Sequence, residues 1–142
     1  NAIRIEEMFY NCKSLKSLDV TGFDTSKAID MYKMFADCQS LESIDVTGFD
    51  TSNVTNMSGM FSGCKSLKTL DVSNFDTSKV EGAEGMFSCC SALETLDLSN
   101  FVISEEADIS GMFAFTRGNQ NLNVISDNPR IMHEFIYRDT GL

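Results

Sequence analysis

Cysteine thiols can form disulfides, bind metals or act as nucleophiles, so we examined the spacing of the five cysteines first. Four of them stand 26 residues apart, at Cys12, Cys38, Cys64 and Cys90. The fifth, Cys89, adjoins Cys90 and lacks the two-residue spacer of a Cys-x-x-Cys metal or redox pair. Met-Phe pairs recur at the same interval, which indicates that the thiols belong to an apolar core. We therefore interpret the cysteines as small buried hydrophobes rather than as disulfides or metal ligands.

Aspartates form a second repeated set, each with a hydroxyl residue two positions before it and another two positions after it. Carboxylate and hydroxyl oxygens can bind cations, basic groups or hydroxyl-rich ligands. If the apolar residues between them point inward, all of these side chains lie on one exposed face. The candidate binding face comprises Ser17, Asp19, Thr21, Ser43, Asp45, Thr47, Thr69, Asp71, Ser73, Thr95, Asp97 and Ser99.

Two interpretations of this face remain open. The aspartates can simply accept hydrogen bonds from the flanking hydroxyls and keep the face solvated, or they can form a site for cations or for a basic or hydroxyl-rich ligand. Calcium takes roughly six to eight oxygens, whereas this face offers oxygens from one flat side and matches no EF-hand loop. We assign no cofactor and keep calcium as an alternative; an ice-binding lattice fits the central carboxylates poorly.

A further aspartate recurs directly before Thr-Ser, at Asp24, Asp50 and Asp76. Aspartate side chains commonly bond to the backbone of such turns, so we interpret this set as turn caps. Signatures of catalysis are missing: the single histidine, His133, stands beside Glu134 without a second histidine at metal-binding spacing. We expect the protein not to be an enzyme, with no catalytic, cofactor-binding or metal-ligating residues.

The recurring apolar residues predict the elements that position these side chains. Spacings of three and four predict a short amphipathic helix, most clearly at Met57, Met60, Phe61, Cys64 and Leu67. Asp30, Asn56 and Asp108 precede such runs and suit an N-cap. A Leu-x-x-Leu-x-Val pattern then predicts a short strand, and Phe-Asp-Thr-Ser predicts a polar return loop.

A fixed period in the twenties is typical of a solenoid, in which each repeat buries its apolar face against its neighbours. The sequence predicts an α/β repeat fold, a leucine-rich-repeat-like solenoid with one short strand and one short helix per 26-residue repeat and a parallel sheet on one face. Residues 1–114 would form about four repeats. Residues 115–142 would form a degenerate last repeat and a C-terminal cap, or a connector to another domain, with a second amphipathic pattern at Ile131, Met132, Phe135 and Ile136.

The 142 residues carry a formal net charge of −10, which argues against nucleic acid and anionic membrane surfaces as partners. No apolar run approaches the roughly 18 residues of a membrane helix. The chain opens at Asn1 without a signal segment, and we interpret it as a piece of a longer protein whose targeting signal lies elsewhere.

The block Ile-Asp-Val-Thr-Gly-Phe-Asp-Thr-Ser-Asn-Val-Thr-Asn-Met-Ser-Gly-Met-Phe-Ser-Gly-Cys, from Ile44 to Cys64, resembles the 26-residue repeat of bacterial surface proteins. These proteins are related to the BspA-like leucine-rich-repeat surface proteins and lipoproteins. The resemblance covers about residues 3–113 and departs from the pattern at 101–104, where the Asp-Thr of the return loop is lost. It implies a cell-surface or secreted protein used in attachment, and it carries over no catalytic residues.

The expected function is therefore a surface or secreted adhesion module that presents the twelve-residue face to a protein or glycan, for example on a host surface or matrix. The alternatives are a structural spacer or stalk with no ligand of its own, and a cation-binding solenoid. The face lacks the aromatic and arginine anchors of most protein interfaces, so Arg117, Tyr137 and Arg138 are further candidates. The sequence leaves the oligomeric state open.

Overall fold

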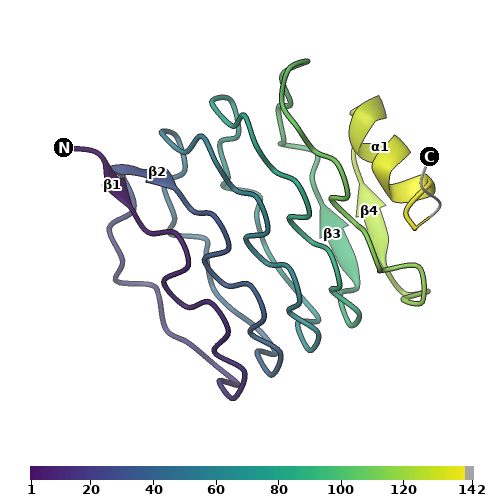
Figure 1. Cartoon of the computed structure of the whole chain (residues 1–142), viewed down its shortest axis with the longest axis horizontal. Coiled ribbons are helices and arrows are strands. Elements are labelled where there is room, and N and C mark those ends of the chain that lie inside the picture. Colours follow the sequence, from purple (N-terminus) through teal and green to yellow (C-terminus); the bar gives the residue numbers. More distant parts are fainter. Residues whose placement is uncertain (140–142) are drawn as a thin grey trace.

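The computed structural model describes residues 1–139 and consists of successive coils of the chain that lie side by side (Figure 1). We call each 26-residue turn of the chain a coil, and residues that occupy the same place in successive coils a column. Isolated parallel bridges join one such column, linking Asp30 to Asn56, Asn56 to Gly82 and Gly82 to Asp108. The period of the sequence is therefore the period of the stacking.

Four short strands pair in parallel between neighbouring coils. β1 (Ile3–Arg4) pairs with β2 (Ala28–Asp30), and β3 (Thr95–Asp97) pairs with β4 (Asn123–Ile125). Parallel pairing between repeats is confirmed. The expected strand in every repeat, forming one parallel sheet, is wrong for the described residues.

The predicted strand segments of the first three coils are extended but joined too sparsely to form a ladder. Glu42 donates one backbone N–H to the carbonyl of Lys16, and Lys68 donates one to Glu42. The aspartates compete for further donors, because the N–H of Thr47 bonds to the side chain of Asp45 and not to a neighbouring coil. Side chains nevertheless alternate inward and outward along these segments.

The expected helix in each repeat is also wrong: α1 (Pro129–Ile136) is the only helix among residues 1–139. The Met-Phe segments are chains of tight turns whose N–H groups alternate between two kinds of acceptor. The N–H groups of Met34, Ala36 and Cys38 bond to carbonyls three residues earlier. Those of Met31, Lys33, Phe35 and Asp37 bond to carbonyls of the next coil.

Left-handed backbone at two positions per coil prevents a continuous helix, since an α-helix of L-residues requires negative φ throughout. In the third coil these positions are glycines, Gly59 with φ 64° and Gly63 with φ 76°. The same two columns have positive φ in every coil, at Glu7, Asn11, Lys33, Asp37, Gly85, Cys89, Gly111 and Phe115. Asp30, Asn56 and Asp108 still accept the N–H two residues later, but they cap turns and not helices.

The core lies inside the coils and consists of the predicted columns. The phenylalanines of the Met-Phe pairs stack on one another, with ring centres 5.6 Å apart between Phe35 and Phe61 and 6.0 Å apart between Phe61 and Phe87. The cysteines are free thiols; Cys38, Cys64 and Cys90 are buried, whereas Cys12 and Cys89 are partly exposed. Burial raises the pKa of Cys38 to about 11 and that of Cys90 to about 12. The interpretation of the cysteines as buried core residues is confirmed for Cys38, Cys64 and Cys90 and not for Cys12 and Cys89.

At the C-terminal end, α1 covers the last coil (Figure 1). Asn128 caps the helix by accepting the N–H groups of Arg130 and Ile131. Ile131 is fully buried and Phe135 meets Phe113 edge-on, with ring centres 5.7 Å apart.

The predicted apolar face of α1 is correct for Ile131 and Phe135 and wrong for Ile136, which is 60% exposed. The division of the chain after residue 114 stays a prediction, and residues 140–142 of the predicted cap lie outside the described residues.

Candidate functional site

The strand face, defined as the twelve predicted Ser, Thr and Asp residues, lies on the outside of the coils. All twelve side chains are exposed, while the residues between them, such as Val20, Val46 and Val72, are buried. The structure thus places four aspartates, one per coil, in a single column with hydroxyl residues on both sides. The prediction that these side chains share one exposed face is confirmed.

Each aspartate on the strand face is held in a fixed orientation by the residue two positions later. The Oδ1 atom of Asp45 accepts the Thr47 backbone N–H at 3.0 Å and the Thr47 hydroxyl at 2.6 Å. The same pair of bonds orients the other aspartates, Asp19, Asp71 and Asp97. The interpretation that flanking hydroxyls bond to these carboxylates is therefore confirmed for the hydroxyl that follows each one.

These bonds keep the carboxylates charged. The hydroxyl and then the backbone N–H of Thr47 lower the pKa of Asp45 below its ordinary value, against a smaller opposing effect from Asp71 and Asp19. The pKa of Asp19, Asp71 and Asp97 is lowered for the same reason. The face therefore presents four ionised side chains at neutral pH.

One shallow hollow of about 390 Å³ lies on the strand face between the second and fourth coils. It brings together five of the predicted residues, at the points where neighbouring coils meet. Its lining is Ile44, Asp45, Thr47, Thr69, Leu70, Asp71 and Thr95. Two carboxylates and three hydroxyls over an apolar floor can accept hydrogen bonds from a basic or hydroxyl-rich group.

The second aspartate column serves the turns, as predicted. The side chain of Asp50 accepts both the N–H and the hydroxyl of Ser52, and Asp24 and Asp76 do the same with Ser26 and Ser78. Within residues 1–139, no group of three or more His, Cys, Asp or Glu side chains is arranged to hold a metal ion.

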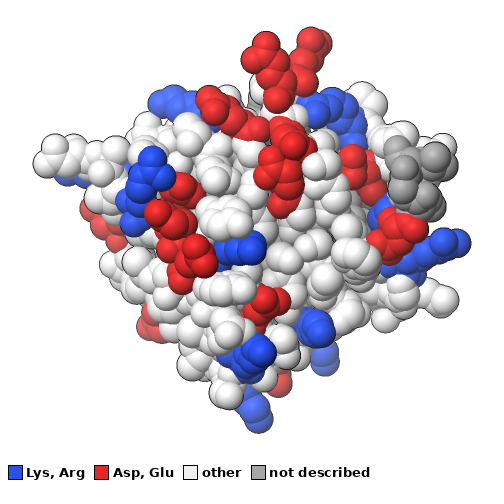
Figure 2. Space-filling view, in the orientation of Figure 1, with Lys and Arg blue, Asp and Glu red and all other residues white. Residues whose placement is uncertain are grey.

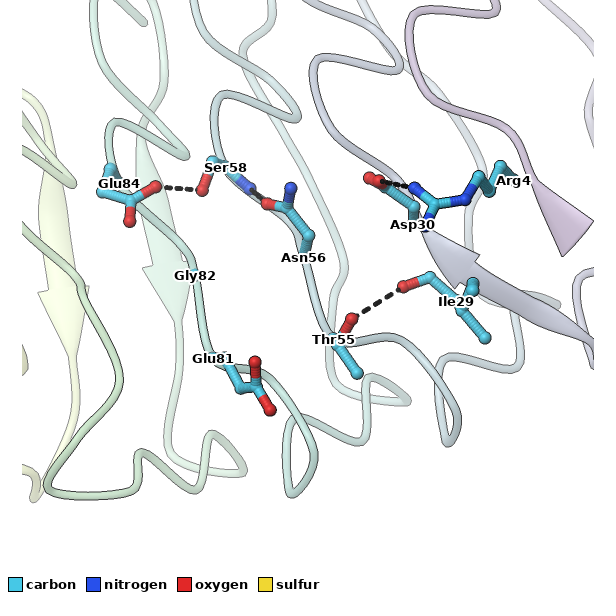
Figure 3. Close-up of a pocket in the computed structure, with 9 residues that line it drawn as sticks. All are labelled: Arg4, Ile29, Asp30, Thr55, Asn56, Ser58, Glu81, Gly82 and Glu84. Atoms are coloured by element: carbon cyan, nitrogen blue, oxygen red, sulfur yellow. Dashed lines mark hydrogen bonds and ion pairs between the residues drawn. The ribbon is translucent and has the colours of Figure 1, made fainter. Parts of the chain in front are cut away.

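A second hollow, of about 400 Å³, was not anticipated from the sequence (Figure 3). We call it the acidic groove, and it follows the column of isolated bridges. Its lining is Arg4, Ile29, Asp30, Thr55, Asn56, Ser58, Glu81, Gly82 and Glu84. The only sequence signal for it is the polar column Asp30, Asn56 and Asp108, which the helix interpretation assigned to N-caps.

The polar groups of the acidic groove bond mainly to one another. Arg4 pairs with Asp30 at 3.1 Å, and the Ser58 hydroxyl donates to Glu84 (Figure 3). Gly82 leaves the space open, because a Cβ there would lie 3.0 Å from the Ser58 hydroxyl oxygen. Figure 2 shows acidic side chains gathered over the upper half of the face in view, with basic side chains beside them.

The tail residues singled out in the sequence do not join either hollow. The Arg138 guanidinium lies over the Phe135 ring and donates to the carbonyl of that residue at 2.8 Å. Tyr137 contacts His133, with ring centres 4.7 Å apart. The backbone N–H of Arg117 bonds to Asp139. No helix within residues 1–139 has the length and apolar character needed to span a membrane.

Taken together, the 26-residue columns, the parallel contacts between coils and the repeated aspartate turns define a protein built from stacked short repeats. Residues 3–125 match the family described as "Mycoplasma protein of unknown function, DUF285", and the chain belongs to that family. No curated protein and no solved structure matches the chain.

Proposed function

We propose that this protein is a binding module that presents the strand face to a protein or glycan partner. The observation that carries this proposal is the row of four exposed carboxylates, each oriented by two hydrogen bonds from its own coil. A polar surface that is already ordered loses less conformational entropy on binding than a mobile one. The module acts by display, without a chemical step.

The unused atoms of the strand face indicate the chemistry of the partner. Each aspartate uses Oδ1 for its turn, while Oδ2 accepts no hydrogen bond among the described residues. The preceding hydroxyls, those of Ser17, Ser43, Thr69 and Thr95, also make none. Lysine and arginine side chains or sugar hydroxyls can donate to these oxygens in successive coils, so affinity would grow with the number of coils engaged.

We also propose that the coils form a leucine-rich-repeat-like solenoid of the BspA-related type, carried by a cell-surface or secreted protein. The stacking period and the inward Leu-x-x-Leu-x-Val residues support the solenoid. The surface location rests on the sequence resemblance. Its direct test is whether an epitope-tagged chain with its native flanking sequence is accessible to antibody on intact cells.

Binding of the purified chain to arrays of glycans and immobilised matrix proteins tests the function. The double substitution Asp45→Asn and Asp71→Asn should weaken binding by at least about tenfold, because it removes two carboxylates from the hollow. The matched control is Asp50→Asn with Asp76→Asn, which alters the turn column and leaves the strand face intact. An equal loss of affinity in both variants, or the absence of saturable binding to any of the ligands tested, would contradict the proposal.

A structural spacer is the second candidate, favoured by the absence of aromatic and arginine side chains among the twelve residues of the strand face. In that case, replacing these coils by unrelated coils of equal length would preserve the activity of any domain they carry. The cation alternative predicts a rise in melting temperature in millimolar calcium that a chelator reverses. An unchanged melting temperature would exclude it.

A further inference from the structure

The fourth coil lacks a side chain that caps the same turn in its neighbours. Asp30, Asn56 and Asp108 each use an Oδ1 atom to accept the backbone N–H two residues later, at 2.9 Å in all three coils. Gly82 takes their place in the fourth coil. Because glycine has no side chain, the corresponding backbone N–H, that of Glu84, has no acceptor among the described residues.

The backbone of the fourth coil follows the same path here as that of the third, so the donor keeps its direction. Ala83 and Gly85 donate their N–H groups to carbonyls of the next coil, as Met57 and Gly59 do one coil earlier. The N–H of Glu84 therefore points to the space that an aspartate or asparagine side chain fills in the other coils. That space adjoins the acidic groove, whose lining includes Glu84 (Figure 3). A backbone donor without an acceptor, beside an open hollow, is a position for the acceptor of a ligand.

The charges around this position select a neutral acceptor. Three carboxylates, those of Asp30, Glu81 and Glu84, line the groove against one guanidinium, which is paired with Asp30. This excess of negative charge would repel a ligand carboxylate. A carboxamide supplies the same oxygen without the charge, as Asn56 does in the neighbouring coil. Its NH₂ group can donate to the carboxylates of Glu81 and Glu84, between which Gly82 lies (Figure 3).

We propose that the acidic groove binds the side-chain carboxamide of an asparagine from a partner polypeptide. The oxygen of that side chain accepts the N–H of Glu84, in place of the side chain that Gly82 lacks. A neighbouring hollow of about 640 Å³ shares Thr55 and Glu81 with the groove, and it gives room for the adjoining residues of the partner. The groove shares no residue with the strand face, so this contact is separate from the one proposed above.

Titration of the isotopically labelled full chain with blocked amino acids tests the ligand by NMR. N-acetyl-asparagine methylamide should produce a saturable shift of the Glu84 amide resonance at roughly millimolar concentration. The aspartate analogue, which adds a charge at nearly the same shape, should bind at least about tenfold more weakly. The alanine analogue, which lacks the carboxamide, should give no saturable shift. Equal binding of the alanine or the aspartate analogue would overturn the proposal, and so would a saturable shift with N-acetylglucosamine alone.

The substitution Gly82→Asn should close the site and stabilise the fold at the same time. The new side chain would supply the missing acceptor, once the Ser58 hydroxyl, 3.0 Å from the added Cβ, rotates aside. The melting temperature should rise by roughly 2–4 °C, and binding of the asparagine analogue should be lost. Gly118→Asn, where an added Cβ meets nothing within 4 Å, is the matched control and should change neither quantity.

The substitution Glu81→Gln gives a second test that requires no repacking, because the side chain is exposed. Removing this carboxylate should weaken binding of the asparagine analogue by about threefold, since the carboxamide NH₂ loses a charged acceptor. It should also narrow the preference for asparagine over aspartate to less than about threefold, because one source of repulsion is gone. An unchanged preference in this variant, or full binding of the asparagine analogue to Gly82→Asn, would overturn the proposal.

Discussion

The first and last coils follow the same backbone path but end in opposite ways. At the last coil, side chains of α1 and the residues after it replace a neighbouring coil: carboxylates of Glu134 and Asp139 accept backbone N–H groups, and Phe135 continues the phenylalanine stack. In the first coil, Met8, Leu15 and Phe23 are exposed, and the backbone carbonyls of Glu6, Met8 and Tyr10 accept no backbone hydrogen bond among the described residues. The repeated residues therefore specify the core columns, whereas covering the last coil requires residues that do not follow the repeat.

The strand face shows the same contrast between inner and last coils. The aspartate column ends at Asp97, and in β4 the residue paired with Asp97 is Ile125. Ile125 is exposed, and Asn123 lies opposite Thr95. The last coil thus lacks the carboxylate that the proposed function requires, and it has the longest run of strand pairing on that face.

The largest expected effect separates an inner coil from the first coil. Phe75→Ala should destabilise the protein by about 4 kcal/mol, because the 2% exposed ring leaves a cavity. Phe23→Ala, in the same column, should cost less, about 2 kcal/mol, because Phe23 is already 37% exposed. Urea denaturation measures both values. Equal losses would show that Phe23 is as well packed as Phe75.

The rate of thiol alkylation should also be lower in the inner coils than in the first coil. At pH 8, burial and the raised pKa values of Cys38 and Cys90 should make both react at least about a hundredfold more slowly than Cys12 in the native state. Timed alkylation followed by peptide mass spectrometry measures the rates. The denatured chain is the control, in which all five cysteines should react at similar rates.

An arginine at each end provides a smaller contrast. Arg130 on α1 donates to the carbonyls of Ser104 and Ala107, both at 2.6 Å, so Arg130→Met should cost about 2 kcal/mol. Arg4 at the open end forms an ion pair while 64% of its side chain is exposed, so Arg4→Met should cost less than about 0.5 kcal/mol. The comparison fails if thermal unfolding gives the two variants the same melting temperature.

The smallest effect concerns acid stability. The four aspartates of the strand face have lowered pKa values in the folded state, so folding releases protons and their contribution is present above the unfolded pKa. It is lost as the pH falls through the folded pKa values. Changing all four to Asn should make the melting temperature fall less steeply between about pH 5 and pH 2. An identical slope in both proteins would contradict this.

The sequence predicts the inside and outside of each coil well, because the columns repeat with little change. It predicts the local backbone poorly, because apolar spacings of three and four fit both a helix and a chain of tight turns. The signal that distinguishes them is Gly59 and Gly63, since their columns require positive φ and also contain the tolerant residues Asn11 and Asp37. Glycine recurs two residues after the start of the last three runs, at Gly59, Gly85 and Gly111, and this recurrence argues against a helix.

The two hollows also differ in whether they could be predicted from the sequence. The strand face could be predicted because its residues keep their type from coil to coil. The acidic groove could not be predicted, because the residue type in its column changes from Arg4 to Asp30, Asn56 and Gly82. Its shape also depends on Gly82, which has no side chain to fill the space. A site whose residue types differ from coil to coil gives no repeated pattern in the sequence, so it is identified only from the three-dimensional structure.

The alternation of N–H groups in the Met-Phe segments has a mechanical consequence. Half of these bonds close turns within a coil, and the other half cross to the next coil along the length of the stack. Tension applied between the two ends would load the crossing bonds boundary by boundary. Each coil that peels away would lengthen the chain by about 90 Å while its neighbours stay folded. A chain of this kind would yield to force in discrete steps.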